Sequence, residues 1–424
     1  MSAPSKPEIE PIEPEPPAIS ADLLDPRLIQ AKGPRGYVDA GLARLRGGDL
    51  GSLPVIVGLI VIVIVFSSLN PRFTDAFNLV NLASQVAAVG IIAMGVVLVL
   101  MLGEIDLSVG SVSGVAAAVL AVLNVVNGYS PWLSVLLAVL GGSAIGLIHG
   151  LIFTKIGVPS FVVTLAGLLA WLGVQLWVLG ERGTINLPPD GVLVEIGQFK
   201  FFKGVSAYVI GIALVGIYLL SQLLKTRRRR AAGLSVQPLW VTLTVTVGLL
   251  VLSIVIAAKL NIDRGIPWIF VLFLGIVLVM DWILRRTRYG RSIFAIGGNI
   301  EAARRAGIRV DAIRISVFVL CSTFAALGGI VAATYGGSAS QQSGAGDTLI
   351  NAIAAAVIGG TSLFGGRSRM YAALLGALVI GAIANGLALL SLETHFRYII
   401  TGSVLLLAVV IDAVSQRGRK HAGR

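Results

Sequence analysis

The chain has 424 residues, of which 56% are hydrophobic and 13% charged, with a mean hydropathy of +0.91. These values exclude a soluble globular domain. The formal net charge of +12 does not indicate a nucleic-acid partner, because the basic residues lie in short clusters between long apolar runs. Since runs of bilayer length recur, the sequence predicts an all-α fold, a polytopic transmembrane helical bundle. The lone Cys321 excludes an intrachain disulfide bond.

Residues 1–50 differ in composition from the rest of the chain. The first twenty positions hold six prolines and several glutamates. Such a segment buries too little apolar surface to fold, and its acidic start does not match a cleavable signal peptide. We expect a disordered cytoplasmic N-terminal segment, of which residues 36–50 can lie along the membrane surface as an amphipathic helix.

Residues 51–414 form the predicted transmembrane domain, followed by a basic cytoplasmic tail over 415–424. Its apolar runs predict twelve spans, near 52–69, 82–103, 107–126, 132–153, 159–180, 205–224, 238–259, 266–284, 315–335, 348–365, 370–390 and 395–413. Lysines and arginines are concentrated in alternate loops, which places both termini in the cytoplasm. The runs 82–126 and 348–390 allow a second interpretation, in which each is a broken or re-entrant helix.

These two runs share a design. Each consists of small and apolar side chains interrupted by a glycine-rich polar hinge, GEIDLSVG over 103–110 and GGTSLFGG over 359–366. A pair of glycine-interrupted segments in corresponding halves indicates a transport path built from two repeats. We therefore predict two pseudo-repeated halves with broken helices, and both inverted and parallel repeats fit the pattern. Residues 183–268, with two spans and a basic loop, are extra material between the halves.

Polar residues and glycines in these runs are the candidates for a translocation pathway, because a polar group in hydrocarbon is costly unless it faces a cavity or another polar group. The candidates are Glu104, Asp106, Ser108, Gly110, Asn351, Thr361, Ser362 and Asn385. Structural alternatives stay open: the first-hinge side chains can cap a helix, the hydroxyls of the second hinge can bond to backbone carbonyls, and the asparagines can bond across helices. His149 is expected to be a packing residue with satisfied ring nitrogens.

The loop over 285–314 is the most distinctive polar stretch, and it holds eight arginines. A short helix is predicted inside it. Asn299 is placed to cap the helix N-terminus, and Glu301 lies in the first turn, where a carboxylate suits the helix dipole. Gly307 fits the position that follows the helix C-cap.

Small side chains cover this predicted helix. Ala302, Ala303 and Ala306 give it a smooth surface, and the helix is held between two predicted spans. A helix of this kind is well shaped to fit a socket on another protein. The alternative is a solvated loop whose arginines only enforce membrane topology.

The loop also resembles a known one. Its run of Gly290-Arg291, Ala295, Gly298-Asn299, Ala302-Ala303 and Gly307-Ile308 is similar to the cytoplasmic coupling loop of permease subunits in bacterial sugar-import ABC transporters, the ribose/xylose/galactoside group. Ala306 replaces the serine that is usual there. The first hinge resembles the family signature GGIDLSVG, with Glu104 in place of the second glycine. The resemblance covers about residues 86 to 413, and the long build over 183–268 is most like the D-xylose transporter permeases.

This resemblance implies the permease subunit of an ATP-driven importer in the bacterial inner membrane, with a pentose such as D-xylose as cargo. A cytoplasmic ABC ATPase subunit would dock on the coupling residues Gly298, Asn299, Glu301, Ala302, Ala303, Gly307 and Ile308. The resemblance also implies a homodimer, a periplasmic sugar-binding protein as partner, and contact with membrane lipid. ATP would be used by the ATPase, and this chain would need no cofactor of its own.

Motifs for other chemistry are absent from the sequence. No lysine stands in a phosphate-binding P-loop, and the three histidines are too scattered for a metal site. The sequence therefore predicts neither an enzyme nor a metalloprotein. Two rival functions stay open: an ABC permease for another cargo, such as a nucleoside or a branched-chain amino acid, and an ion-coupled secondary transporter. The second rival would more often carry an ionisable residue in mid-span.

Overall fold

A computed structural model of the chain describes residues 53–410, apart from residues 235, 237, 364, 367, 394, 397, 405, 408 and 409. The predicted segment 1–50 and the basic tail 415–424 lie outside the described residues, as does the end of the twelfth predicted span. Of the described residues, 211–253 form one compact unit and the others form a second. The first unit consists of the larger parts of two helices, α9 and α10. All the candidate site residues belong to the second unit.

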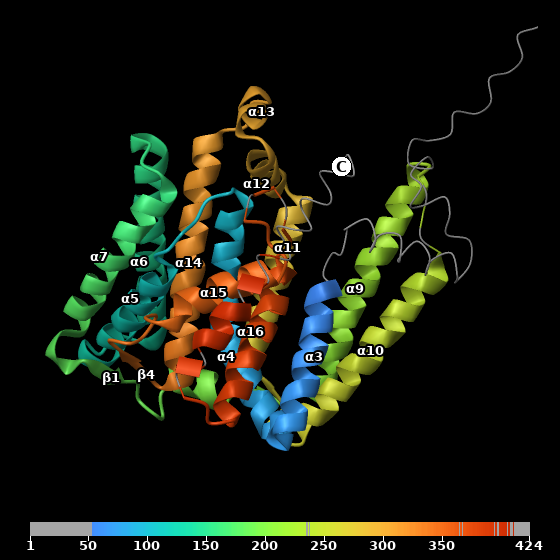
Figure 1. Ribbon diagram of the computed structural model, residues 1–424, viewed down its shortest axis with the longest axis horizontal. Helices are drawn as coiled ribbons and strands as arrows, with labels where there is room; N and C mark the ends of the chain where they lie inside the picture. The colour runs from blue at the N-terminus through green and yellow to red at the C-terminus, as the bar shows by residue number, and fades with distance from the viewer. Residues whose placement is uncertain are drawn as a thin grey trace, which may run out of the picture. The chain divides into compact units, whose positions relative to one another are not determined.

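The described chain is almost entirely helical. Its helices are α3 (Leu53–Leu69), α4 (Ala76–Met101), α5 (Val109–Ala121), α6 (Pro131–Leu151), α7 (Ser160–Leu179), α8 (Val192–Val194), α9 (Val205–Ala231), α10 (Leu239–Asn261), α11 (Trp268–Arg286), α12 (Arg288–Gly298), α13 (Ile300–Arg305), α14 (Val310–Gly336), α15 (Asp347–Ile358) and α16 (Tyr371–Leu389) (Figure 1). Four short strands form two antiparallel pairs, β1 (Thr184–Asn186) with β4 (Ser338–Ser340) and β2 (Phe201–Phe202) with β3 (Ile266–Pro267).

Nine of the described helices are long and apolar enough to cross a membrane. The predicted class, an all-α polytopic membrane protein, is therefore confirmed. The predicted count of twelve spans is not confirmed: the helices over 52–69 and 348–365 are shorter, with 17 and 12 residues, and 395–413 lies partly outside the described residues. Residues 348–365 were expected to cross the bilayer in one interpretation, but α15 ends at Ile358 after 12 residues. A helix of that length rises about 18 Å, whereas the hydrocarbon core is about 30 Å thick, so this run is broken, as in the second interpretation.

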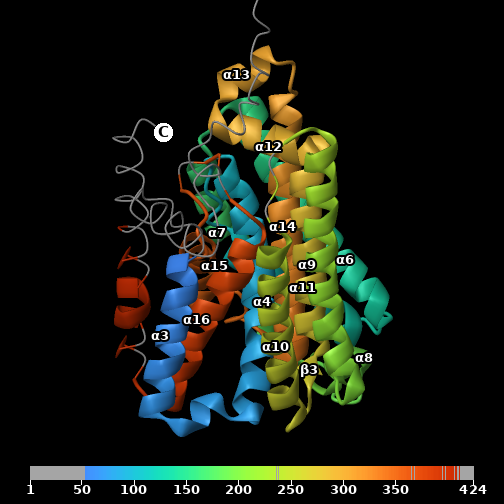
Figure 2. The ribbon, with the colours of Figure 1, turned by 90° about the vertical axis from the view of Figure 1, so that its right-hand side faces the viewer.

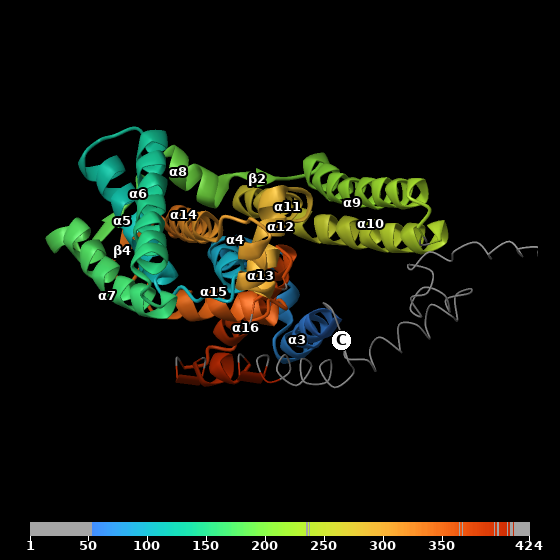
Figure 3. The ribbon, with the colours of Figure 1, turned by 90° about the horizontal axis from the view of Figure 1, so that it is seen from above.

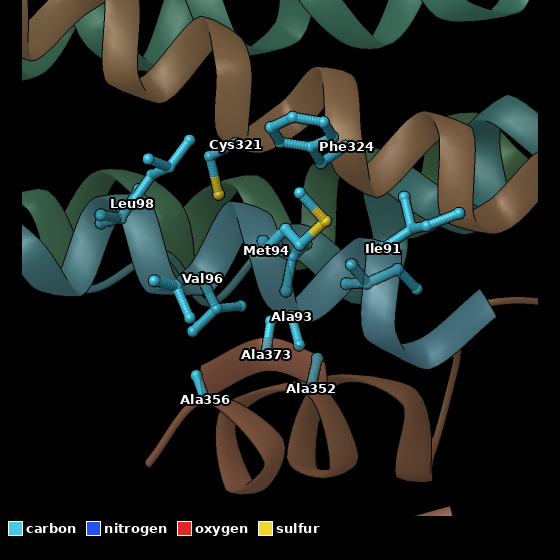
Figure 4. Packing of buried hydrophobic residues seen from close by; sticks show 14 of the residues in the cluster. Ile91, Ala93, Met94, Val96, Leu98, Cys321, Phe324, Ala352, Ala356 and Ala373 are labelled. Carbon is cyan, nitrogen blue, oxygen red and sulfur yellow. The ribbon is translucent and has the colours of Figure 1, made fainter. Parts of the chain in front are cut away.

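Helix α4 is the centre of the second unit, surrounded by α11, α14, α15 and α16 (Figure 3). Its residues are buried almost throughout, because it presents small and aliphatic side chains on every face. Figure 4 shows Met94 and Leu98 of α4 beside Cys321 of α14, with alanines of α15 and α16 on the opposite side. Such small residues let helix backbones approach closely, which is how helices associate in lipid.

The helix order long, short, long occurs twice, as α4–α5–α6 and as α14–α15–α16. Helices α4 and α14 pack antiparallel, since Gly95 meets the backbone of Cys321 and Gly328 meets that of Ala88. Helix α6 also runs antiparallel to α14, and α16 runs antiparallel to α4 and to α15. The two triplets therefore run in opposite directions, so the predicted repeats are of the inverted kind.

This arrangement corrects the pairing of the two hinges. The connection between α4 and α5, residues 102–108, corresponds by its place in the triplet to residues 337–346 between α14 and α15. The second glycine-rich hinge, 359–366, lies instead between α15 and α16. Composition alone matched it with the first hinge because both are rich in glycine and hydroxyl side chains.

Candidate functional site: a buried polar segment and a capped helix

The chain turns back into the bundle directly after α4. Gly103 has φ +79°, a left-handed conformation that favours glycine, and Glu104 N–H donates to the Val99 carbonyl, which ends the helix. The following residues bring Asp106 and Ser108 into the interior, where Asp106 is 3% exposed and Ser108 is fully buried. Helix α5 begins there, and Asp106 lies beside Cys321, partway along α14.

Ser108 is part of a chain of hydrogen bonds in which each side chain donates to the next. Trp171 Nε1, on α7, donates to His149 Nε2 at 2.9 Å, so the neutral imidazole of His149 carries its proton on Nδ1. His149 Nδ1 lies 3.4 Å from Ser108 Oγ and donates to it. Ser108 Oγ donates in turn to Asp106 Oδ1 at 2.6 Å. This chain joins the start of α5 to α6 and α7, and it gives His149 the satisfied packing role that was predicted.

The two oxygens of Asp106 have different surroundings. Oδ1 accepts from Ser108 Oγ and, at 2.8 Å, from Ser108 N–H, an Asx turn that holds Ser108, the residue before α5, in place. Oδ2 is buried and accepts no hydrogen bond from a nitrogen or oxygen atom in the described structure, and the Cys321 thiol lies close to the same carboxylate. A buried carboxylate oxygen without a partner is energetically costly and remains able to accept a hydrogen bond.

Glu104 is neutralised within the bundle. Arg314 Nη2, at the start of α14, lies 3.1 Å from Glu104 Oε1, and both side chains are only 17% exposed. Ser160 Oγ donates to the other carboxylate oxygen at 2.7 Å. The Arg314 guanidinium also lies 4.9 Å from the ring centroid of Phe153, a cation–π contact. The connection 102–108 is thus held by a charge pair that links residues 210 positions apart in sequence.

The segment after β4 closes against the start of α5. Gly110 and Gly344 meet so closely that a Cβ on Gly110 would lie 2.6 Å from the Gly344 carbonyl oxygen. Gln175 is fully buried on α7 and donates to the carbonyls of Ser340 and Ser343, at 3.0 and 2.8 Å, while its Oε1 has no partner. The first turn of α15 therefore lies next to the first turn of α5.

Two of the other pathway candidates, Asn385 and Thr361, have side-chain partners of their own. Asn385 is buried and exchanges two hydrogen bonds with Asn78 of α4, at 2.8 and 2.9 Å, which is the cross-helix role left open by the sequence. Thr361 is buried and pairs with Ser368 Oγ at 2.8 Å. Asn351 and Ser362 are partly exposed, on α15 and in the connection that follows it.

The predicted coupling helix is present as α13. Asn299 Oδ1 accepts from Ala302 N–H at 2.9 Å, which is the predicted N-cap. Gly307 has φ +78°, and Ile308 N–H donates to the Ala303 carbonyl at 3.1 Å, which completes the predicted C-terminal cap. Together with α12, this helix lies at one end of the second unit, beyond the N-terminal end of α14 (Figure 2).

Two features of this loop were not predicted. Ala303 was expected on a small docking face, but it is 3% exposed and packs in the chain's own core, while Glu301, Ala302 and Gly307 are exposed. A helix, α12, also precedes α13 and buries Gly290, Ile293 and Ile296 on one side. Burial raises the pKa of Tyr289 on α12, whose hydroxyl pairs with Ser316 at 2.9 Å. The loop is a folded platform from which part of α13 projects.

Three further contacts were outside the reach of the sequence. Arg314 was one of eight loop arginines, and no sequence pattern singles out Trp171 or Gln175 within its apolar run. Their partners lie far away along the chain, and only the packing of α6, α7 and α14 brings them together. Within the described part of the chain, no group of three or more His, Cys, Asp or Glu side chains could hold a metal ion.

A bundle of membrane helices, interrupted around a buried polar segment and carrying a capped helix on a folded loop, defines a multi-pass transport permease. The profile of the family described as "Branched-chain amino acid transport system / permease component" matches residues 78–409. The chain belongs to this family and is a transport component rather than an enzyme.

Individual relatives of the chain are also transport permeases. The xylose transport system permease protein XylH of Escherichia coli is 34% identical over 382 residues, covering 89% of this chain and 95% of its own length. XylH of Haemophilus influenzae is 33% identical over 377 residues, covering 88% and 99%. The ribose import permease protein RbsC of Bacillus subtilis is 32% identical over 365 residues, covering 86% and 94%. No solved structure gives a significant match.

Proposed function

We propose that this chain is the membrane-spanning permease subunit of an ABC importer that moves a sugar, a pentose such as D-xylose, across the bacterial inner membrane. The observation that carries the proposal is the capped, partly exposed helix α13, set on a folded loop between two membrane spans. Relatives that transport xylose and ribose, at 34% and 32% identity, support a sugar as cargo.

In this proposal the α13 end faces the cytoplasm and both chain termini lie on that side. A cytoplasmic ABC ATPase subunit docks on Gly298, Asn299, Glu301, Ala302, Gly307 and Ile308, uses the ATP, and leaves this chain without a cofactor of its own. A periplasmic sugar-binding protein delivers the cargo at the β1–β4 end. Two copies of the chain form a homodimer surrounded by membrane lipid.

The charges near α5 favour an uncharged cargo. Glu104 is already paired with Arg314, so it offers no free charge to a zwitterionic amino acid. Asp106 Oδ2 remains as an acceptor for a sugar hydroxyl. A transport path needs only weak contacts of this kind, since tight binding would slow release. We therefore place Asp106 and Ser108 on the translocation pathway, with Gly110, Asn351 and Ser362 as further members.

The experiment is uptake by proteoliposomes that contain the chain, its co-purified ATPase and the binding protein. The proposal predicts uptake of labelled D-xylose that requires ATP on the side of the membrane that carries the ATPase. An ionophore that abolishes ion gradients should not reduce this uptake. Competition with unlabelled ribose, a nucleoside and leucine ranks the cargo classes. Uptake that collapses with the ion gradient would establish a secondary transporter instead, and selective competition by leucine would establish an amino-acid permease.

A further inference from the structure

Four glycines from three separate parts of the chain meet at one point. They are Gly103, Gly297, Gly365 and Gly366, gathered around the carbonyl of Met101, and we call them the glycine junction. Gly366 N–H donates to the Met101 carbonyl at 3.0 Å. A Cβ on Gly297 would collide with that same carbonyl oxygen and would lie 2.7 Å from Gly366 N. A Cβ on Gly365 would lie 2.8 Å from the Gly297 carbonyl oxygen and 3.0 Å from Gly103 N.

The junction joins the three polar segments that the sequence singled out. Gly297 lies in the last turn of α12, three residues before the docking helix α13. Gly103 begins the connection 102–108, which carries Asp106 into the bundle. Gly365 and Gly366 belong to the connection between α15 and α16. These contacts are backbone to backbone, and closely packed backbone transmits a displacement with little slack because no flexible side chain lies between.

A second link lies on the other side of the docking helix. Arg314 follows α13 and holds Glu104 through their ion pair at 3.1 Å. The docking loop thus reaches this part of the chain at two places: Gly297 packs against Met101, just before the connection 102–108, and Arg314 pairs with Glu104 within it. A movement of the loop that carries α13 would act on both contacts.

We propose that the glycine junction is the mechanical link through which movement of α13 repositions residues 102–108 and 359–366 during transport, with Gly297 as its key positioning residue. The inference rests on the proposed docking of an ATPase at α13. It assigns to Gly297 a role in coupling ATP hydrolysis to transport, and none in contacting the cargo.

A glycine of the preceding helix, Gly275 on α11, provides the control. A Cβ at Gly275 meets nothing within 4 Å, whereas one at Gly297 displaces the Met101 carbonyl. In proteoliposomes with the ATPase and the binding protein, we expect Gly297→Ala to assemble and to hydrolyse ATP at the basal rate. Its ATP-driven D-xylose uptake should fall at least about fivefold, the scale of an ordinary coupling free energy. Gly275→Ala should transport within about twofold of the parent, a change too small to count as lost coupling.

Parent-like uptake by Gly297→Ala, or equal loss in both variants, would overturn the inference while leaving the proposed function intact. Absence of ATP-driven uptake by the unsubstituted complex would overturn both. Should Gly297→Ala fail to fold, hydrogen–deuterium exchange of the unsubstituted complex decides the question. Binding of a non-hydrolysable ATP analogue should change exchange in peptides covering 102–108 and 359–366 together, and no change in either would refute the link.

Discussion

Substitutions of Asp106 can distinguish a structural role at the start of α5 from a role in transport, because its two carboxylate oxygens have different surroundings. Asp106→Asn keeps Oδ1 in place for both hydrogen bonds from Ser108 and replaces the unpartnered Oδ2 with an amide nitrogen. The charged acceptor is lost, at about 1 kcal/mol per bond. Removing a buried charge offsets part of this loss, but the new amide nitrogen is a buried donor without an acceptor. We expect Asp106→Asn to lose about 1–2 kcal/mol of unfolding free energy, less than the alanine variant.

The alanine variant should behave differently. Asp106→Ala leaves the Ser108 N–H and hydroxyl buried without their acceptor, and each such donor costs about 1–3 kcal/mol. The expected loss is about 3 kcal/mol, or roughly a hundredfold in the unfolding equilibrium. Denaturant titration of the detergent-solubilised protein measures the unfolding free energy of both variants. An alanine variant as stable as the parent would contradict the two hydrogen bonds from Ser108 to Asp106.

Uptake at limiting D-xylose then tests the pathway. If Oδ2 accepts a hydrogen bond from a sugar hydroxyl, Asp106→Asn loses a charge-assisted bond of about 1.5–3 kcal/mol, so uptake should fall about tenfold or more. The variant should still fold and bind the ATPase, which co-purification verifies. Normal uptake by a well-folded asparagine variant would leave Asp106 as support for Ser108 at the start of α5 and remove it from the pathway.

Three further predictions use the same preparations. Trp171→Phe removes the donor to a buried imidazole nitrogen and should cost about 1–3 kcal/mol of unfolding free energy; an unchanged denaturation midpoint would contradict the hydrogen-bond chain. Ala303→Glu places a charge in the core and should abolish folding, whereas Ala302→Glu should fold and lose ATPase binding in co-purification. Equal behaviour of these two variants would contradict the orientation of α13. A cysteine introduced at the exposed Gln342 should react with a membrane-impermeant thiol reagent added to sealed cells, and one at Asn299 should not; the reverse pattern would invert the topology.

Local features of the fold could be predicted because they depend on residues close in sequence. The caps of α13 at Asn299 and Gly307 follow from the geometry of one helix, and both are present. The interruption of the chain after Gly103 follows from glycine beside polar residues. The apolar runs identified the membrane helices because bilayer thickness fixes their length.

The features that could not be predicted from the sequence depend on tertiary packing. Which face of α13 is buried depends on where α12 lies, so Ala303 could not be placed from its small size alone. The ion pair of Glu104 spans 210 positions, and nothing near Arg314 in sequence distinguishes it from its neighbouring arginines. The spacing of Gly290, Ile293 and Ile296 does carry a signal, since positions three apart share a helix face. That signal could have revealed α12.

The opposed half-length helices have an electrical consequence. Helices α5 and α15 start side by side, where Gly110 approaches Leu349, and run toward opposite ends of the bundle. The start of each helix carries roughly half a positive elementary charge. Each of these positive ends has an acidic side chain beside it, Asp106 before α5 and Asp347 in the first turn of α15. The two helix starts therefore stabilise carboxylates with backbone dipoles where the two halves of the bundle meet.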